Sequence, residues 1–218
     1  MNYLPIVPAV IPKSQEEVID FSKVLSFSPE FHLDLVDGQF VETVSWPYTP
    51  SGEPMAVKPY LDRYTLEVDL MVANPVSAAK AWVEAGADML VFHVETLNLN
   101  DLKNFANDYK VSIGVSAHGD TPLSTLVEYV AEADYIQLMG IYKIGAQGMP
   151  FDENVLDKIT ALKKQFPLKS ITVDGSVNKD TIKRLADAGA DRFICGSAIV
   201  KQSDPESAHE YLSGLVNE

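Results

Sequence analysis

Acidic residues and a histidine stand at the ends of three apolar, strand-like runs. His32 and Asp34 alternate with leucines in one run, Asp69 lies in a second, and Asp174 ends a third just before a glycine. Imidazole nitrogens and carboxylate oxygens are common ligands of divalent metal ions. We therefore expect that these four side chains can converge on one metal ion.

Each of these residues also has a structural explanation. Because side chains alternate along a strand, His32 and Asp34 share one face, and a buried His–Asp pair would account for them without a metal. Asp69 could be a carboxylate at the exposed end of its strand. Asp174 could cap the next helix through an Asx turn. The sequence alone leaves these alternatives open.

Asp34 and Asp174 belong to well-separated runs, so they could approach a bound ligand from opposite sides. One carboxylate can then remove a proton next to a carbonyl group, and the other can return a proton to the opposite face. A nearby cation would stabilise the negative charge of the enediolate that forms. This pair is typical of an epimerase.

Two Gly-Ser pairs follow the seventh and eighth strand-like runs. Gly175-Ser176 and Gly196-Ser197 could bind a phosphate group, because small residues let backbone N–H groups approach an anion closely. The loop after the sixth run contains Gly145, Gln147 and Gly148. We expect this loop either to close over a ligand or to be a long, mobile connection.

The other three histidines have weaker expectations. His93 could pair with Glu95, line the pocket or be a structural histidine, and we favour the structural interpretation. His118 ends the fifth run and could contact a substrate. His209 lies in the last helical pattern, where we expect it to be solvated.

Eight strand-like runs alternate with helical patterns along the chain, and this alternation predicts parallel strands joined by helical crossovers. Eight such units predict a single (β/α)8 TIM barrel over residues 1–218, with reacting groups at the carboxyl ends of the strands. The expected strands are Leu4–Ile11, Phe31–Leu35, Tyr64–Met71, Met89–Val94, Val111–Ala117, Tyr135–Met139, Ser170–Val173 and Arg192–Cys195. Expected helices include Pro75–Ala85, Glu153–Gln165 and Lys179–Ala188.

Two features qualify this pattern. The second unit is irregular, because residues Val41–Tyr60 contain four prolines and predict a long loop with at most a short helix. The tetrapeptide AGAD occurs at Ala85–Asp88 and again at Ala188–Asp191. It indicates either two half-barrels or simply a favourable turn from a helix into a strand.

The composition excludes several classes of partner. The chain has 218 residues, of which 46% are apolar, and a formal net charge of −14. A nucleic-acid partner is not expected without a basic face, and no apolar run reaches the length of a membrane span. The single cysteine and the absence of a basic flank near the N-terminus favour a reducing, cytoplasmic compartment. The net negative charge of the chain would repel a phosphorylated ligand at long range. The binding site must then attract this ligand locally, with backbone amides or a metal ion.

Six segments together resemble the ribulose-phosphate 3-epimerase family over essentially the whole chain. The segments are HLDLVDGQFV (32–41), DLMVANP (69–75), AGADMLVFHVE (85–95), GVSAHGDTP (114–122), ITVDGSV (171–177) and AGADRFICGSAI (188–199). The resemblance implies a (β/α) barrel, a divalent metal ion and conversion of D-ribulose 5-phosphate to D-xylulose 5-phosphate. It also implies a homo-oligomer.

The resemblance assigns roles to individual residues. His32 matches a metal ligand, and Asp34 and Asp174 match residues that serve as both ligand and acid or base. The two Gly-Ser pairs match phosphate-binding turns, and Met71 and Met139 match methionines near the reacting centre. The VDGS form of the seventh strand is similar to that of the allulose-phosphate epimerases. The ion implied is zinc, iron or manganese.

The chain departs from the family pattern in three places. Asp69 stands where the family has a histidine ligand, Ala9 replaces a serine, and residues 143–148 replace the sequence PGFGGQ. A third carboxylate adds a negative charge, which at about 4 Å is worth on the order of 4 kcal/mol at an effective dielectric of 20. Either Asp69 does not bind the metal, or the site favours a harder ion such as Mn²⁺ or Mg²⁺, or the activity has drifted.

The sequence therefore predicts a metal-dependent epimerase that acts on a ketose phosphate. A binder of sugar phosphates without catalytic activity is the alternative that the change at Asp69 favours. A phosphosugar decarboxylase or aldolase on the same barrel is less consistent with the sequence, because no lysine accompanies the acids of the second strand.

Overall fold

Eight parallel strands close into a barrel in the order in which they occur along the chain. The computed structural model describes residues 4–146 and 148–217. The strands are β1 (Ile6–Val10), β2 (Glu30–Val36), β3 (Thr65–Met71), β4 (Met89–His93), β5 (Ser112–Ser116), β6 (Tyr135–Met139), β7 (Ser170–Asp174) and β8 (Arg192–Cys195). The (β/α)8 prediction is confirmed, and each expected strand is present with small differences at its ends.

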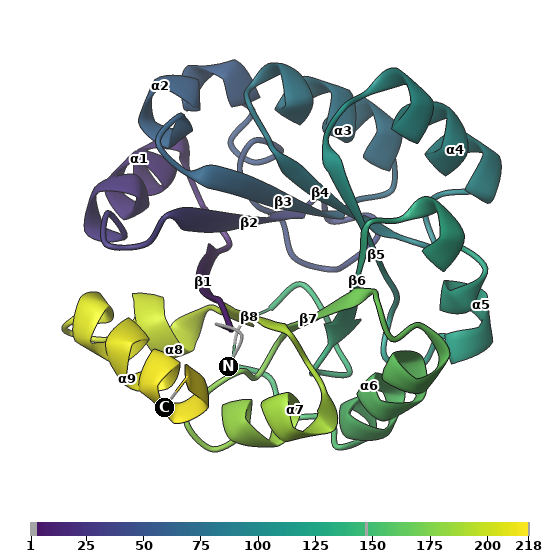
Figure 1. Ribbon diagram of the computed structural model, residues 1–218. Helices are drawn as coiled ribbons and strands as arrows, with labels where there is room; N and C mark the ends of the chain where they lie inside the picture. The colour runs from purple at the N-terminus through teal and green to yellow at the C-terminus, as the bar shows by residue number, and fades with distance from the viewer. Residues whose placement is uncertain (1–3, 147, 218) are drawn as a thin grey trace.

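Helices surround the barrel as an outer ring (Figure 1). They are α1 (Gln15–Val24), α2 (Lys58–Leu61), α3 (Pro75–Glu84), α4 (Leu99–Asp108), α5 (Leu123–Val127), α6 (Asn154–Gln165), α7 (Ile182–Ala188), α8 (Ser197–Val200) and α9 (Pro205–Asn217), with 3₁₀ turns η1 (Pro54–Ala56) and η2 (Val130–Glu132). None of these helices combines the length and the apolar character needed to cross a bilayer.

The main hydrophobic core lies between the strands and the helices. Outward-facing strand residues such as Leu33, Val68 and Phe92 are fully buried there. Burial of apolar surface is the dominant favourable term in folding, so this shell holds the barrel together. The opposite faces of the same strands point into the barrel and are free to carry polar groups.

The irregular second unit was predicted correctly. The chain runs from β2 through a long connection to the short elements η1 and α2. By contrast, helix α7 begins at Ile182, three residues after the expected start at Lys179. The side chain of Asn178 accepts a hydrogen bond from the backbone N–H of Asp180, and this local turn competes with helix formation.

The two AGAD segments make the same turn. Gly86 and Gly189 both have positive φ, at 102° and 110°. The carboxylate of Asp88 accepts a hydrogen bond from the backbone N–H of Leu66, and that of Asp191 does the same for Ile171. Each aspartate thus links the start of its strand to the strand before it. The repeated sequence is therefore explained by the same turn from a helix into a strand at both places.

Candidate active site and metal centre

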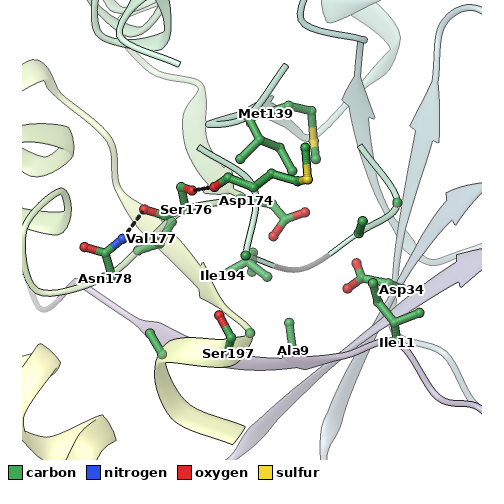
Figure 2. A pocket seen from close by; sticks show the side chains of 18 of the residues that line it. Ala9, Ile11, Asp34, Met139, Asp174, Ser176, Val177, Asn178, Ile194 and Ser197 are labelled. Atoms are coloured by element: carbon green, nitrogen blue, oxygen red, sulfur yellow. Dashed lines mark hydrogen bonds between the residues drawn. The ribbon is translucent and has the colours of Figure 1, made fainter. Parts of the chain in front are cut away.

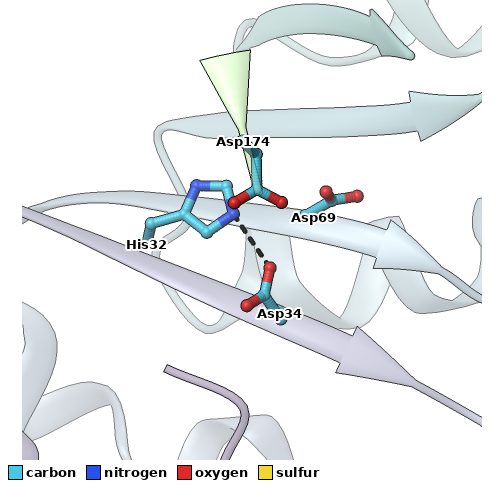
Figure 3. Close-up of side chains that lie close together, drawn as sticks. All are labelled: His32, Asp34, Asp69 and Asp174. Atoms are coloured by element: carbon cyan, nitrogen blue, oxygen red, sulfur yellow. Dashed lines mark hydrogen bonds and ion pairs between the residues drawn. The ribbon is translucent and has the colours of Figure 1, made fainter. Parts of the chain in front are cut away.

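The four predicted ligands converge inside the barrel. Each offers one ligand atom, and the four atoms all lie within 4.8 Å of one another. His32 and Asp34 come from β2, Asp69 from β3 and Asp174 from β7, and Figure 3 shows the four side chains close together, with His32 directed toward Asp34. Asp34 and Asp69 are partners in the register between β2 and β3, so strand pairing brings these two carboxylates together.

His32 is held from below by a buried ion network. Its Nδ1 lies 2.6 Å from Glu67 Oε2 and its Nε2 lies 3.1 Å from Asp34 Oδ1. Glu67 also accepts hydrogen bonds from Tyr135 and, at 2.7 Å, from Arg192 Nη1. Because a carboxylate on one ring nitrogen fixes the orientation of the imidazole, Nε2 faces the cluster of aspartates.

The electrostatics of this network favour a cation at Nε2. Burial by itself lowers the pKa of His32, but the charge of Glu67 and the hydrogen bond to Asp34 raise that pKa well above its usual value. Burial raises the pKa of Glu67, yet the charges of Arg192 and His32 hold it at about 2. The Nε2 position thus attracts either a proton or a metal ion that takes the place of that proton.

Asp34 and Asp174 face each other across the cavity (Figure 2). Burial raises the pKa of both carboxyl groups, and the negative charge of Asp34 adds to the rise at Asp174, whose pKa lies well above its usual value. Crowded carboxylates of this kind are stabilised by a divalent cation. One nitrogen and three oxygens are a suitable donor set, so the residues present fit the metal ion that the sequence predicts.

Asp69 is fully buried, so the alternative of a carboxylate at an exposed strand end is wrong. Its Oδ1 lies 3.0 Å from Nε2 of His93, and its Oδ2 accepts a hydrogen bond of 2.7 Å from Nε2 of Gln137. His93 therefore does not pair with Glu95, which instead accepts a hydrogen bond from the backbone N–H of His118.

A cavity of about 490 Å³ opens at the carboxyl ends of the strands. Asp34 and Asp174 line its floor, and Met71, Met139 and Ile141 form an apolar wall. These three side chains belong to one buried apolar cluster, and electrostatic interactions beside apolar groups are screened less than in water.

The predicted anion-binding turns lie on one side of this cavity. Gly175, Ser176, Gly196 and Ser197 all line it, and Figure 2 shows Ser176 and Ser197 at that side. Lys201, at the end of α8, is the only cationic residue among the described residues that line the cavity. The sequence analysis missed Lys201, although its spacing of four residues from Ser197 places the two on one face of a helical turn.

The loop after β6 is attached to the loop after β2. Lys143 Nζ lies 2.6 Å from Glu42 Oε2, and the hydroxyl of Thr43 donates a hydrogen bond to the backbone oxygen of Gly145. Gly145 and Gly148 line the cavity as predicted. The predicted contact of Gln147 lies outside the described residues.

Two histidines differ from their expectations. His118 lines a separate, small cavity with Thr121 and Lys158 rather than the main one. His209 lies on α9, but it is half-buried and donates a hydrogen bond of 2.8 Å from Nε2 to the backbone oxygen of Ile6. It therefore attaches the last helix to β1 instead of being solvated.

Comparisons with known proteins agree with this geometry. A family model described as the ribulose-phosphate 3 epimerase family matches residues 5–200. Ribulose-phosphate 3-epimerase of Bacillus subtilis is 32% identical over 84% of this chain and 85% of its own length. The enzyme of the same name from Mycobacterium leprae is 29% identical over 93% of this chain and 91% of its own length.

Solved structures support the fold. A 3-hexulose-6-phosphate synthase superimposes with a TM-score of 0.72 at 18% identity, over 98% of this chain and 100% of the other. A 3-keto-L-gulonate-6-phosphate decarboxylase from Vibrio cholerae also gives 0.72, at 14% identity over 100% of both chains. At such low identity these similarities concern the barrel alone.

Proposed function

The chain belongs to the ribulose-phosphate 3-epimerase family, and from that membership we propose that it is a metal-dependent epimerase of a ketose phosphate. The proposed reaction interconverts D-ribulose 5-phosphate and D-xylulose 5-phosphate or close analogues. The observation that carries this proposal is the pair Asp34 and Asp174, which face each other across one cavity beside His32 and Asp69.

Asp34 and Asp174 would exchange protons with the substrate. The two carboxyl groups lie close together in one cluster, and a pair of this kind can hold one proton on one group while the other group is ionised. The ionised carboxylate removes the proton from the carbon next to the carbonyl group. The protonated one delivers a proton to the opposite face, which inverts the configuration of that carbon.

The remaining residues bind and shield the substrate. A divalent cation held by His32, Asp34, Asp69 and Asp174 would supply positive charge beside the oxygen atoms on which negative charge develops. The backbone N–H groups of the two Gly-Ser turns would bind the phosphate group, and Lys201 would provide the local positive charge that a chain of net charge −14 needs.

Exchange with heavy water tests the proposal. The protein, supplied with Mn²⁺ or Zn²⁺, is incubated in D₂O with D-ribulose 5-phosphate and with related pentulose and hexulose phosphates. We expect deuterium at the carbon next to the carbonyl group of at least one substrate, together with its epimer. Asp174→Asn should slow the exchange about 10²- to 10⁴-fold.

The matched control is Asp120→Asn, which removes an exposed carboxylate (63% side-chain exposure) outside the main cavity and should leave the exchange rate unchanged. If every candidate ketose phosphate stays unlabelled with metal present, the epimerase proposal is wrong.

A sugar-phosphate binder without turnover is the second candidate. The third carboxylate, Asp69, favours it, because extra negative charge opposes formation of an enediolate. This candidate predicts that sugar phosphates raise the melting temperature of the protein while no label enters them. Labelled substrate would exclude it.

A further inference from the structure

Asp69 is a candidate ligand with a tightly constrained side chain. It is fully buried, and each of its oxygens has a separate N–H partner, His93 Nε2 at 3.0 Å and Gln137 Nε2 at 2.7 Å. The two partners come from β4 and β6, on the side of the barrel away from His32. The carboxylate therefore cannot rotate away from the cluster without breaking a buried hydrogen bond.

The two hydrogen bonds leave Asp69 able to bind a cation. A carboxylate has about four lone-pair positions, so each oxygen keeps one after accepting a hydrogen bond. The two N–H donors also offset part of the negative charge of the group. Asp69 thus remains able to bind a cation through oxygen from a fixed position. Its two hydrogen bonds reduce the electrostatic repulsion that its negative charge would exert on an anionic substrate.

The donor set of the cluster is rich in oxygen, with one imidazole nitrogen and three carboxylates within 4.8 Å of one another. Zn²⁺ prefers nitrogen and sulfur donors in four-coordinate sites, whereas carboxylates suit Mn²⁺ in octahedral sites. Four protein ligands complete a tetrahedral shell, but they leave two positions of a six-coordinate ion for the oxygens of a substrate.

We propose that Asp69, held in place by His93 and Gln137, shifts the preference of this site from Zn²⁺ toward Mn²⁺. Zn²⁺ binds most nitrogen and oxygen sites more tightly than Mn²⁺. The proposed shift therefore means that the ratio of the Mn²⁺ to the Zn²⁺ dissociation constant is smaller than it would be without Asp69. The inference depends on the metal centre of the proposed function and does not depend on turnover.

Metal binding by untagged protein tests the inference. Protein treated with EDTA and dialysed is titrated with Zn²⁺ against a chelating dye, and with Mn²⁺ while electron paramagnetic resonance reports the free ion. We expect Asp69→His to increase the ratio of the Mn²⁺ to the Zn²⁺ dissociation constant at least tenfold. Gln137→Leu should increase it at least threefold, because Asp69 then loses one of its two anchors.

The matched control is Asp157→His, which makes the same exchange at an exposed position on α6 and should leave the ratio unchanged. An unchanged ratio in a folded Asp69→His variant would overturn the inference. If circular dichroism shows that Asp69→His does not fold, Asp69→Asn replaces it, and the same ratio should then rise at least threefold; no rise overturns the inference.

The outcome is separable from that of the epimerase proposal. A shifted ratio without deuterium exchange would support the role of Asp69 and refute the epimerase. Deuterium exchange together with an unchanged ratio of the dissociation constants would support the epimerase proposal and refute the role of Asp69.

Discussion

Replacing Arg192 by methionine removes the buried guanidinium beneath the candidate metal site. Arg192 is 8% exposed and donates hydrogen bonds of 2.7 Å to Glu67 and to Glu30. Although burial raises the pKa of Glu67, Arg192 and His32 hold it at about 2, compared with an ordinary 4.5. One pKa unit corresponds to about 1.36 kcal/mol, so the ionised form of Glu67 contributes roughly 3 kcal/mol to stability near neutral pH.

Arg192→Met should therefore lower the free energy of unfolding by about 3–5 kcal/mol, because it leaves Glu67 charged and buried without its strongest partner. Urea unfolding at pH 7, with EDTA present so that bound metal does not contribute, measures this loss. The pKa of Glu67 is lower in the folded than in the unfolded state. Its contribution is thus complete above pH 4.5 and disappears as the pH falls toward 2, so the two unfolding free energies should approach each other there.

Arg184→Met is the matched control, because it breaks an exposed arginine–glutamate pair with Glu153. Exposed pairs contribute about 1 kcal/mol or less. A double variant, Arg192→Met with Glu67→Gln, should recover part of the loss, since the fully buried charge at position 67 is then also removed. If Arg192→Met and Arg184→Met lose the same small amount, or if the loss is independent of pH, the assignment of Glu67 as a buried, paired carboxylate is refuted.

Three further predictions concern Lys201, Gly175 and Cys195. Lys201→Met should raise the KM for a phosphorylated ketose about tenfold and leave kcat within about twofold of the wild-type value. The control Lys13→Met, in the neighbouring groove, should change neither constant. If both variants have the same kinetics, Lys201 does not bind the phosphate group. Gly175→Ala should lower stability by about 1–3 kcal/mol in thermal unfolding, because φ is +94° and a Cβ atom would lie 2.7 Å from Ile141 Cγ1; an unchanged melting temperature would contradict this. Burial and the nearby charge of Asp174 raise the pKa of the Cys195 thiol. A disulfide reagent at pH 8 should therefore modify this thiol only after the protein is unfolded in urea. Rapid modification of the native protein would contradict the prediction, because it would show that the thiol is accessible.

The strands and the convergence of the four candidate ligands could be predicted because they depend on local patterns. Alternation along a strand places His32 and Asp34 on one face, and the barrel architecture brings the carboxyl ends of all strands to one mouth. The structure confirms both expectations. The start of α7 at Ile182 could not be predicted in the same way, because a side-chain turn at Asn178 outweighs the helical pattern there.

The groups that orient these side chains could not be predicted, because they come from other strands and are far away in the sequence. Glu67 is 35 residues from His32, and Gln137 is 68 residues from Asp69. Which of these side chains meet depends on the register of strands across the closed barrel, and the sequence of one strand does not specify that register. His93 illustrates the limit: its structural role was expected, but its partner was not.

The barrel interior is therefore organised in two polar layers with different tasks. The lower layer, in which Glu67 contacts Arg192 and Tyr135, does not line the cavity. A buried ion pair adds little to stability compared with well-packed apolar residues, so stability alone does not explain this layer. Its contact with the upper layer runs through His32 Nδ1, and that contact directs Nε2 toward the aspartates. The buried charge is best explained as the means by which the fold fixes one candidate metal ligand, His32, from beneath, as His93 and Gln137 fix Asp69 from the side.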